Sequence, residues 1–469
     1  MATISSAGIG SGLDVNSIVT QLMAIEKQPL TALQTKETTI QSTVSEYGKI
    51  KSAVSTLNDL ATKLAGASTW AQTVTNSSST AVSASSNNSA AGTYSVEVQK
   101  LASVQTIATG TAMPLTSTLG AGTLHIELGT WGAGQTSFTA SATAPAVDIA
   151  IAATDTLANI RDKINGAGAG VTALIMTDAS GSRLLLRSNA SGAANGFRTS
   201  GFAPLGFDPS SGVSTMTQSQ AASDAAATVN GLAVTATSNT LSNIVDGLTL
   251  NLSAVTTAPV TVNVVADTDA LKKTITDFAA AYTAVIQLIA TDTKYNPTAK
   301  KGGILQGDSA AVGLQRQLRT LAGSLSGASS TYAHLSDVGV ELQADGSMTV
   351  NATKLGNALG NLGELKKMFS NSNVLDPTQD GFAKRFRVAT DSMLGIDGAL
   401  TTRTDGLQNQ LQRNHKDQDA LQVRLDAIEK RLRAQYTALD AQMAVLTSQS
   451  NYITQQINAF NASNSSSNK

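Results

Sequence analysis

The clearest hydrophobic pattern lies at the C-terminal end of the chain. Apolar residues recur every seven positions there, and most positions between them are polar. The row consists of Leu425, Leu432, Leu439, Leu446, Ile453 and Phe460. Such a repeat is typical of helices that pair along a coiled-coil seam. It predicts a helix that extends roughly 50 Å between the first and last of these residues, with a partner helix against its seam.

The N-terminal end also has a helical pattern. Ile18, Leu22 and Ile25 recur at helical spacing after Asp14, and Pro29 is expected to break or kink this helix. A second helical run then continues to Gly66. Its seven-residue row consists of Leu33, Ile40, Tyr47, Val54 and Ala61. We expect the two ends of the chain to pair, antiparallel or as a bundle, and to contact neighbouring subunits. Packing within one monomeric bundle is the alternative.

The middle of the chain has the pattern of short strands. Polar and apolar residues alternate over residues 93–98 and 124–128, and residues 171–176 and 183–186 are further expected strands. Gly and Asn dipeptides between them favour an antiparallel arrangement. Residues 76–90 are rich in Ser, Asn and Thr, which predicts a linker.

A weak internal repeat lies in this region. Residues 156–160 read Thr-Leu-Ala-Asn-Ile, and residues 240–244 read Thr-Leu-Ser-Asn-Ile. Each copy follows a short apolar run and precedes another. The pattern therefore predicts, at both places, a short N-capped helix between two strands, although five similar residues can also arise by chance.

Helical patterns return after the strands. Residues 269–289 form one long apolar face, and Asp308 or Ser309 is expected to cap the next helix. Residues 340–350 read as a hairpin that turns at Asp345 and Gly346, a favoured pair for a tight turn.

These patterns together predict an α+β multidomain fold. Long helical, coiled-coil terminal segments flank an antiparallel β-rich central head. We expect residues 1–40 and 411–469 to form a terminal leg, and residues 41–76 and 266–410 a helical or mixed middle domain. Residues 77–105 and 223–265 would form a β-rich head domain. Residues 106–222 would form a β-rich outer head inserted in it.

Composition and charge narrow the function classes. The 469 residues carry a formal net charge of -1 and include no cysteine. Disulfides and thiolate metal sites are therefore excluded, and no basic field exists to bind nucleic acid. The N-terminus lacks the basic and apolar regions of a signal peptide, and no apolar run approaches the ~20 residues that span a bilayer.

Candidate chemistry is sparse. His125, His334 and His415 lie far apart in the sequence, which argues against a zinc site. Ser309 follows Gly307 and Asp308 but lacks the flanking glycine of a nucleophile elbow, so a helix cap is the better interpretation. The glycine-rich residues 166–170 have the wrong spacing for a phosphate loop. We expect no catalytic residue, no cofactor and no metal.

Several segments resemble one known family. Residues 4–14 read Ile-Ser-Ser-Ala-Gly-Ile-Gly-Ser-Gly-Leu-Asp, which is similar to the opening of the flagellar hook-associated protein 2 family, the filament cap. The resemblance continues in order over nearly the whole chain and is weakest in residues 100–150 and 204–220. Its other segments are residues 25–30, 229–231, 238–240, 247–250, 307–309, 345–346, 435–440 and 451–453. Residues 156–165 also resemble a motif shared with flagellins and hook-associated proteins.

The resemblance implies a structural protein, not an enzyme. Members form a homo-oligomeric ring, commonly a pentamer, at the distal tip of the filament. The ring promotes folding and polymerisation of exported flagellin and prevents its leakage. Export through the flagellar type III apparatus would need no cleaved signal peptide. The implied partners are further copies of the chain, flagellin, hook–filament junction proteins and a type III export chaperone, with no nucleic acid and no membrane.

The two apolar rows are the expected oligomer and filament interface. Its residues would be Ile18, Leu22, Ile25, Leu425, Leu432, Leu439, Leu446, Ile453 and Phe460. Two other functions stay open on the sequence alone. One is another axial protein of the flagellum, such as a hook–filament junction protein, and the other is a surface adhesin.

Overall fold

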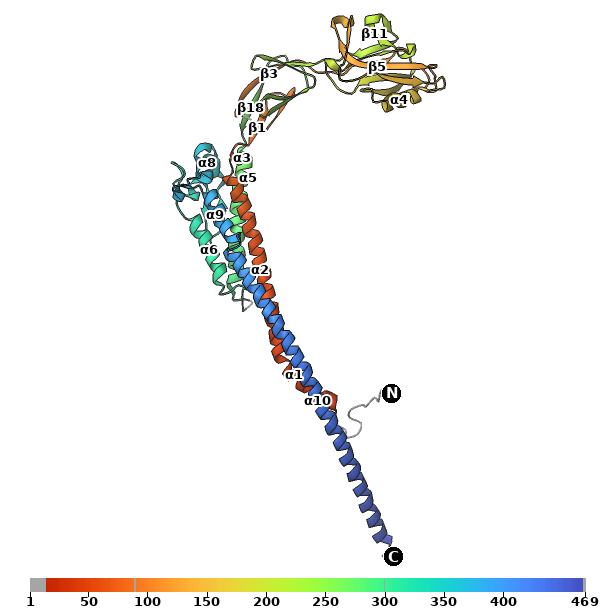
Figure 1. Cartoon of the computed structure of the whole chain (residues 1–469). Coiled ribbons are helices and arrows are strands. Elements are labelled where there is room, and N and C mark those ends of the chain that lie inside the picture. Colours follow the sequence, from red (N-terminus) through yellow and green to blue (C-terminus); the bar gives the residue numbers. More distant parts are fainter. Residues whose placement is uncertain (1–13, 88–89, 299, 467–469) are drawn as a thin grey trace. The chain divides into compact units, whose positions relative to one another are not determined.

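The computed structural model describes residues 14–87, 90–298 and 300–466 (Figure 1). The described chain divides into two compact units. One combines the two ends of the chain and is mainly helical, whereas the other, Ala67–Leu271, is built of antiparallel sheets. The predicted α+β class, with long terminal helices and an antiparallel β-rich centre, is confirmed. The Gly-rich segment at residues 4–13 that carries part of the family resemblance lies outside the described residues.

The helical unit begins with two helices separated at the predicted break. Asp14 caps the first, since its carboxylate accepts a hydrogen bond of 2.9 Å from the Ser17 amide. Lys27 separates the two helices, Pro29 sits in the first turn of the second, and Gly66 ends it. Apart from α5 (Thr268–Thr293), the α-helices of this unit are α1 (Val15–Glu26), α2 (Gln28–Ala65), α6 (Ser309–Ala322), α7 (Ala352–Leu359), α8 (Leu362–Ser370), α9 (Phe382–Leu394) and α10 (Ala399–Ser466).

Helix α5 (Thr268–Thr293) supplies the central apolar face of this unit. Among the described helices, α5 is the one that is long and apolar enough to cross a bilayer, judged by its length and composition alone. Its apolar face lies in the protein core instead. Phe278 and Tyr282 are buried, and their rings meet the Phe386 ring edge-on with centroids 5.1 and 5.9 Å apart. Such edge contacts add roughly 0.5–1.5 kcal/mol each beyond burial.

The predicted hairpin is present in the same unit. Strands β21 (Val340–Leu342) and β22 (Met348–Val350) pair antiparallel around Asp345 and Gly346. A second short pair, β19 (Tyr295–Asn296) and β20 (Lys301–Gly302), follows α5. Asp308 is the N-cap of α6, as one of the two predicted caps.

Glu364 makes the stability of the helical unit dependent on pH. Its carboxylate accepts hydrogen bonds from Lys367 Nζ at 2.7 Å, Ser329 Oγ at 2.8 Å and the Ser330 amide at 2.8 Å. These hydrogen bonds lower the pKa of Glu364 from 4.5 to about 2, and the one from Lys367 has the largest effect.

The resulting stabilisation is present above pH 4.5 and is lost as the pH falls through about 2. We expect Glu364→Gln to flatten the pH dependence of the free energy of unfolding between these values. Urea denaturation followed by far-UV circular dichroism at several pH values measures it. Parallel curves for the wild type and the variant would show that Glu364 has no such role.

The β-rich unit contains two hydrophobic cores. The first lies between a five-stranded sheet of order β1-β18-β3-β14-β15 and a three-stranded sheet of order β16-β17-β2. These strands are β1 (Thr73–Ser77), β2 (Val82–Ser86), β3 (Gly92–Lys100), β14 (Ala225–Val229), β15 (Leu232–Ala236), β16 (Thr240–Val245), β17 (Leu248–Leu252) and β18 (Val260–Ala266). The prediction of a linker was wrong for residues 82–86, because β2 pairs along its whole length with β17 and buries Val82.

The second core lies beneath helix α4 (Leu157–Gly166). It is enclosed by a six-stranded sheet and a four-stranded sheet of order β13-β4-β9-β8. The strands are β4 (Thr106–Thr109), β5 (Gly122–Trp131), β6 (Phe138–Ala140), β7 (Val147–Ile151), β8 (Val171–Asp178), β9 (Gly181–Ser188), β10 (Gly196–Ser200), β11 (Phe207–Asp208), β12 (Val213–Ser214) and β13 (Met216–Gln220). All recorded pairs are antiparallel.

The predicted repeat holds at one copy and fails at the other. Thr156 caps α4 and exchanges hydrogen bonds with Asn159 in a capping box. Thr240 has Asn243 at the same spacing, yet residues 240–245 form strand β16, which pairs with β17. The second predicted helix was therefore wrong, because pairing within the sheet outweighs the local helix signal.

Candidate assembly interface

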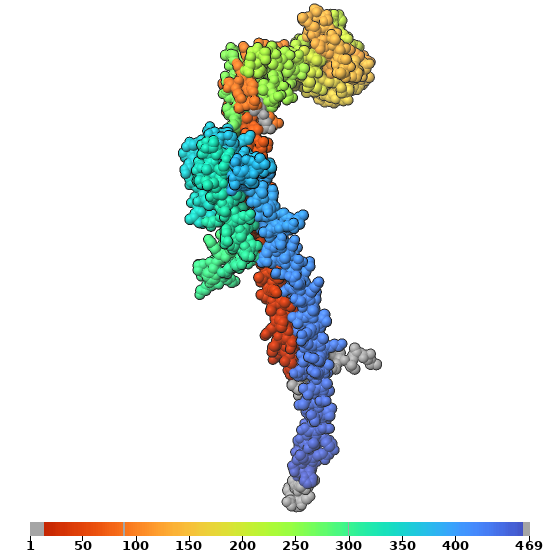
Figure 2. All heavy atoms as spheres, turned by 60° about the vertical axis from the view of Figure 1, so that its left-hand side comes forward, coloured from red at the N-terminus to blue at the C-terminus, as the bar shows by residue number. Residues whose placement is uncertain are grey.

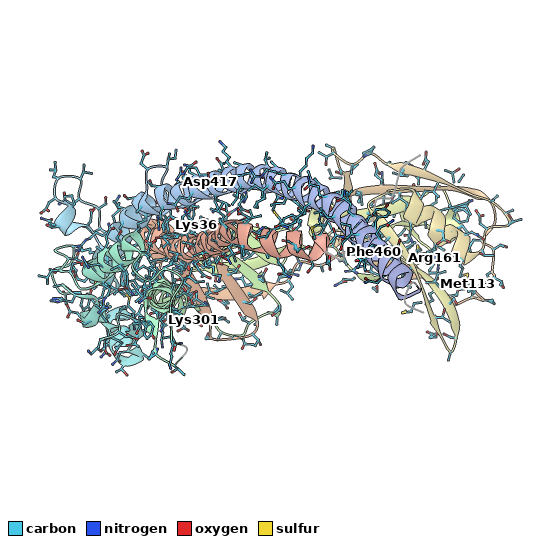
Figure 3. All side chains as sticks on the ribbon, turned by 90° about the horizontal axis from the view of Figure 1, so that it is seen from below. Lys36, Met113, Arg161, Lys301, Asp417 and Phe460 are labelled. Atoms are coloured by element: carbon cyan, nitrogen blue, oxygen red, sulfur yellow. The ribbon has the colours of Figure 1, made fainter. Side chains whose placement is uncertain are left out.

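The N-terminal helices run antiparallel to α10. Arg433 on α10 donates to Asn16 on α1 at 3.0 Å, and further along, His415 on α10 lies 2.9 Å from Glu37 on α2. The position on α10 thus falls as the position on the N-terminal helices rises. Figures 1 and 2 show these helices side by side, and Figure 3 marks them by Lys36 and Asp417. The predicted antiparallel pairing of the two ends is present.

One face of α1 closes on α10 in a small hydrophobic cluster. Val15, Val19 and Met23 recur at i, i+4 and i+8 and are buried together with Leu425, which is 1% exposed. Leu421, Ile428, Leu432, Tyr436 and Leu30 pack around them. Two of the predicted interface residues, Leu425 and Leu432, therefore belong to a seam within one chain.

The predicted face of α1 is not the one that contacts α10. Ile18 and Leu22 are half-buried, and Ile25 is 63% exposed. Helix α1 contacts α10 through Val15 and Val19. The side that carries Ile18, Leu22 and Ile25 is therefore a second apolar side of α1. A helix that is apolar on two sides is typical of one that packs against two neighbours.

Helix α10 continues beyond this cluster as an exposed apolar stripe. Figures 1 and 2 show its C-terminal part extending past α1. The exposed fractions are 43% for Leu439, 38% for Met443, 57% for Leu446, 56% for Ile453, 54% for Ile457 and 65% for Phe460. Burial of a fully exposed side chain of this kind contributes about 1.5–3 kcal/mol, and roughly half of that remains to be gained here because each side chain is already partly covered. Four of the predicted interface residues thus lie on a surface that can contact another molecule.

An aspartate whose side chain is 7% exposed fixes the beginning of α10. The Asp308 carboxylate accepts hydrogen bonds from the Tyr47 hydroxyl at 2.6 Å and from Arg403 Nη2 at 2.7 Å and Nε at 3.0 Å. It also accepts from the Ala310 and Ala311 amides as the α6 cap. Burial raises the pKa of Asp308, but the Tyr47 and Arg403 contacts outweigh it and lower that pKa overall. This cluster joins α2, α6 and α10.

A polar residue interrupts the packing of α10. Asn414 is 3% exposed, and its Oδ1 accepts from Gln418 Nε2 at 2.6 Å. Within the described residues its Nδ2 has no hydrogen-bond partner. An unpaired buried donor costs roughly 1–3 kcal/mol, and a single polar residue in a helical seam commonly fixes register.

We therefore expect Asn414→Leu to raise the free energy of unfolding by about 1–2 kcal/mol, because it removes the unpaired buried donor. Chemical denaturation of the purified protein measures the change. Gln410→Leu, on the exposed side of the same helix, serves as the control and is expected to stay within about 0.5 kcal/mol. A destabilised Asn414→Leu protein would contradict the interpretation.

The described residues contain no group of three or more His, Asp and Glu side chains that could hold a metal ion. Each histidine instead faces one carboxylate. His125 lies 2.6 Å from Asp148, and His334 lies 3.8 Å from Asp337.

Comparison with known proteins identifies the family of this chain. The model described as flagellar hook-associated protein 2 N-terminus matches residues 11–105, and the one described as its C-terminus matches residues 222–448. Flagellar hook-associated protein 2 of Escherichia coli K12 is 34% identical over 445 residues, which cover 91% of this chain and 92% of that protein. This chain belongs to the flagellar hook-associated protein 2 family. A third model, the flagellin hook IN motif, matches residues 133–190.

Other members of the flagellar hook-associated protein 2 family agree. The B-type flagellar hook-associated protein 2 of Pseudomonas aeruginosa PAO1 is 28% identical, and the match covers 90% of this chain and 90% of that protein. The crystal structure of the D1-D2-D3 domains of the flagellar cap protein FliD from Escherichia coli is 32% identical. It matches 77% of this chain and 99% of its own with a TM-score of 0.57.

Two features of this region were not predicted from the sequence. The buried row Val15, Val19 and Met23 has the same helical spacing as the predicted row beside it, so a count of both rows could have found it. The contact between Asp308 and Arg403 joins residues far apart in the chain. No local signal marks it.

Proposed function

We infer that this chain is a flagellar filament cap. The observation that carries this inference is family membership over nine-tenths of the chain, together with the likeness to a solved flagellar cap protein. The exposed apolar stripe of α10 supports it, because such a surface suits a protein that docks into an assembly.

We propose a ring of copies, with five as the expected number, at the distal tip of the filament. The two apolar rows that include Ile18 and Leu446 would contact neighbouring copies and the filament. The ring would help exported flagellin to fold and join the filament and would prevent its leakage. Hook–filament junction proteins and a type III export chaperone would be further partners, and export would need no cleaved signal peptide. No catalytic step is required.

We further propose that these tasks divide along the chain. Residues 1–40 with 411–469 would dock as the leg, and residues 41–76 with 266–410 would hold the leg in place. Residues 77–105 with 223–265, and the inserted residues 106–222, would form the head that meets incoming flagellin. The separate hydrophobic cores of the β-rich unit support a division of the head.

Deletion of the gene tests the proposal. Cells without the protein are expected to lose long filaments and to release unpolymerised flagellin into the medium. Addition of the purified full-length chain should restore filament growth. Normal filaments in the deletion strain would remove the cap function.

A further inference from the structure

The four-stranded sheet of the β-rich unit ends in an open edge. Strand β8 is the last in the order β13-β4-β9-β8, and its recorded strand partner is β9 alone. At the start of the strand, Asn165 of α4 covers the edge, since its side-chain amide accepts from the Ala173 amide at 2.7 Å and donates to the Ala173 carbonyl at 3.0 Å. This side chain occupies the position that a neighbouring strand would take.

The same edge is open further along. Backbone groups that face one side of a strand recur every second residue, so the pairs on Ile175 and Thr177 face outward as those of Ala173 do. Among the described residues, no hydrogen bond is recorded for these outward groups. Natural proteins usually protect such edges with charges, bulges or prolines. Here residues 174–177 contain none of them.

The solvent face beside this edge is apolar. Leu174 and Met176 of β8 are 48% and 52% exposed. Leu174 lies opposite Leu185 on β9, which in turn lies opposite Ala108 on β4. Arg183 and Arg187 flank Leu185 on the same face. The surface combines unpaired backbone groups, adaptable apolar side chains and positive charge.

The edge of β15 offers a contrast within the same unit. Strand β15 also ends a sheet, but Leu232 is its one exposed large apolar side chain. The residues whose backbone groups face away from β14 are Ala233 and Thr235. The β8 edge is thus the better site for a chain that must bind through both backbone and apolar contacts.

We propose that the β8 edge at residues 174–177 binds an extended, unfolded polypeptide segment as an added strand. Its apolar residues would lie beside Leu174 and Met176, and acidic or neutral residues would suit the two arginines. Under the proposed cap function, on which this identification rests, the segment belongs to exported flagellin. The added strand would hold that chain extended, and the contact would shield it from other unfolded segments.

Fluorescence anisotropy with the full chain tests the proposal. The probe is a fluorescent peptide of alternating valine and threonine with glutamate at both ends. When the valines lie beside Leu174, an antiparallel strand turns its threonine amides toward β8. N-methylation of the threonine amides should weaken binding at least tenfold, and N-methylation of the valine amides should change it less than twofold. Equal effects would overturn strand addition.

A matched pair of variants locates the site. Leu174→Ser with Met176→Ser, which removes the apolar contacts without changing the charge, should weaken binding of the unmodified peptide at least tenfold, whereas Leu232→Ser on β15 should leave it within twofold. Unchanged binding to the double variant would overturn the site. A double variant that alters the sedimentation of the protein alone, with peptide affinity unchanged, would overturn the occupant in favour of a second copy. Peptide binding is measured without filaments, so its failure leaves the cap function standing.

Discussion

Replacement of Leu446 and Ile453 by aspartate is expected to abolish capping while the free protein stays folded. Both side chains are more than half exposed on α10, so the carboxylates meet water in the isolated chain. In an assembled interface each would be desolvated without a partner, at a cost of several kcal/mol. Each 1.4 kcal/mol weakens docking tenfold. We expect a deletion strain that carries the gene of this variant to release as much flagellin as the deletion strain without it.

A matched control separates the stripe from charge in general. Ser448→Asp with Gln455→Asp adds the same charge two residues along the same exposed helix, on its other side. This variant is expected to restore motility and to retain flagellin. Capping by the Leu446 and Ile453 variant would show that the exposed stripe does not dock. Leu432 is a poorer test position, because it packs against α1 within the chain.

Replacement of Asp308 by alanine is expected to destabilise the helical unit by about 3 kcal/mol. The change removes the cap of α6, worth about 1 kcal/mol. It also leaves the buried Tyr47 hydroxyl and the Arg403 guanidinium without their acceptor. Arg403 retains partial contact with solvent, with 36% of its side chain exposed, so the loss should fall at the low end for a buried pair. Urea denaturation followed by circular dichroism measures it.

Asp308→Asn is the matched control. The amide oxygen can still cap α6, but the negative charge that faces Arg403 is lost. We expect roughly half the destabilisation of the alanine variant. A loss below about 1 kcal/mol for Asp308→Ala would show that the cluster does not fix α10.

Periodicity predicted the long terminal helices, but not the partner of each face. Residues 18, 22 and 25 and residues 15, 19 and 23 form two helical rows side by side on α1. The second row closes on α10 and the first remains accessible. A hydrophobic period shows that a face is buried in some state. Whether the covering surface belongs to the same chain depends on where the partner helix lies, which the period does not contain.

The failed predictions have a common physical cause. Residues 76–87 carry small polar side chains with no strong strand signal, yet β2 pairs with β17, far along the chain. Residues 240–244 hold the Thr and Asn of a helix cap and still form a strand. In both segments, pairing with distant residues determines the conformation. The Asp308 cluster depends on distance in the same way, since Tyr47 and Arg403 reach it from opposite ends of the sequence.

Immunogold labelling of intact filaments tests the central claim most directly. An antibody raised against this chain is applied to cells that carry the gene and to the deletion strain. The cap function predicts label confined to the distal tip of each filament and absent from the deletion strain. Label at the junction of hook and filament, or along the shaft, would contradict it.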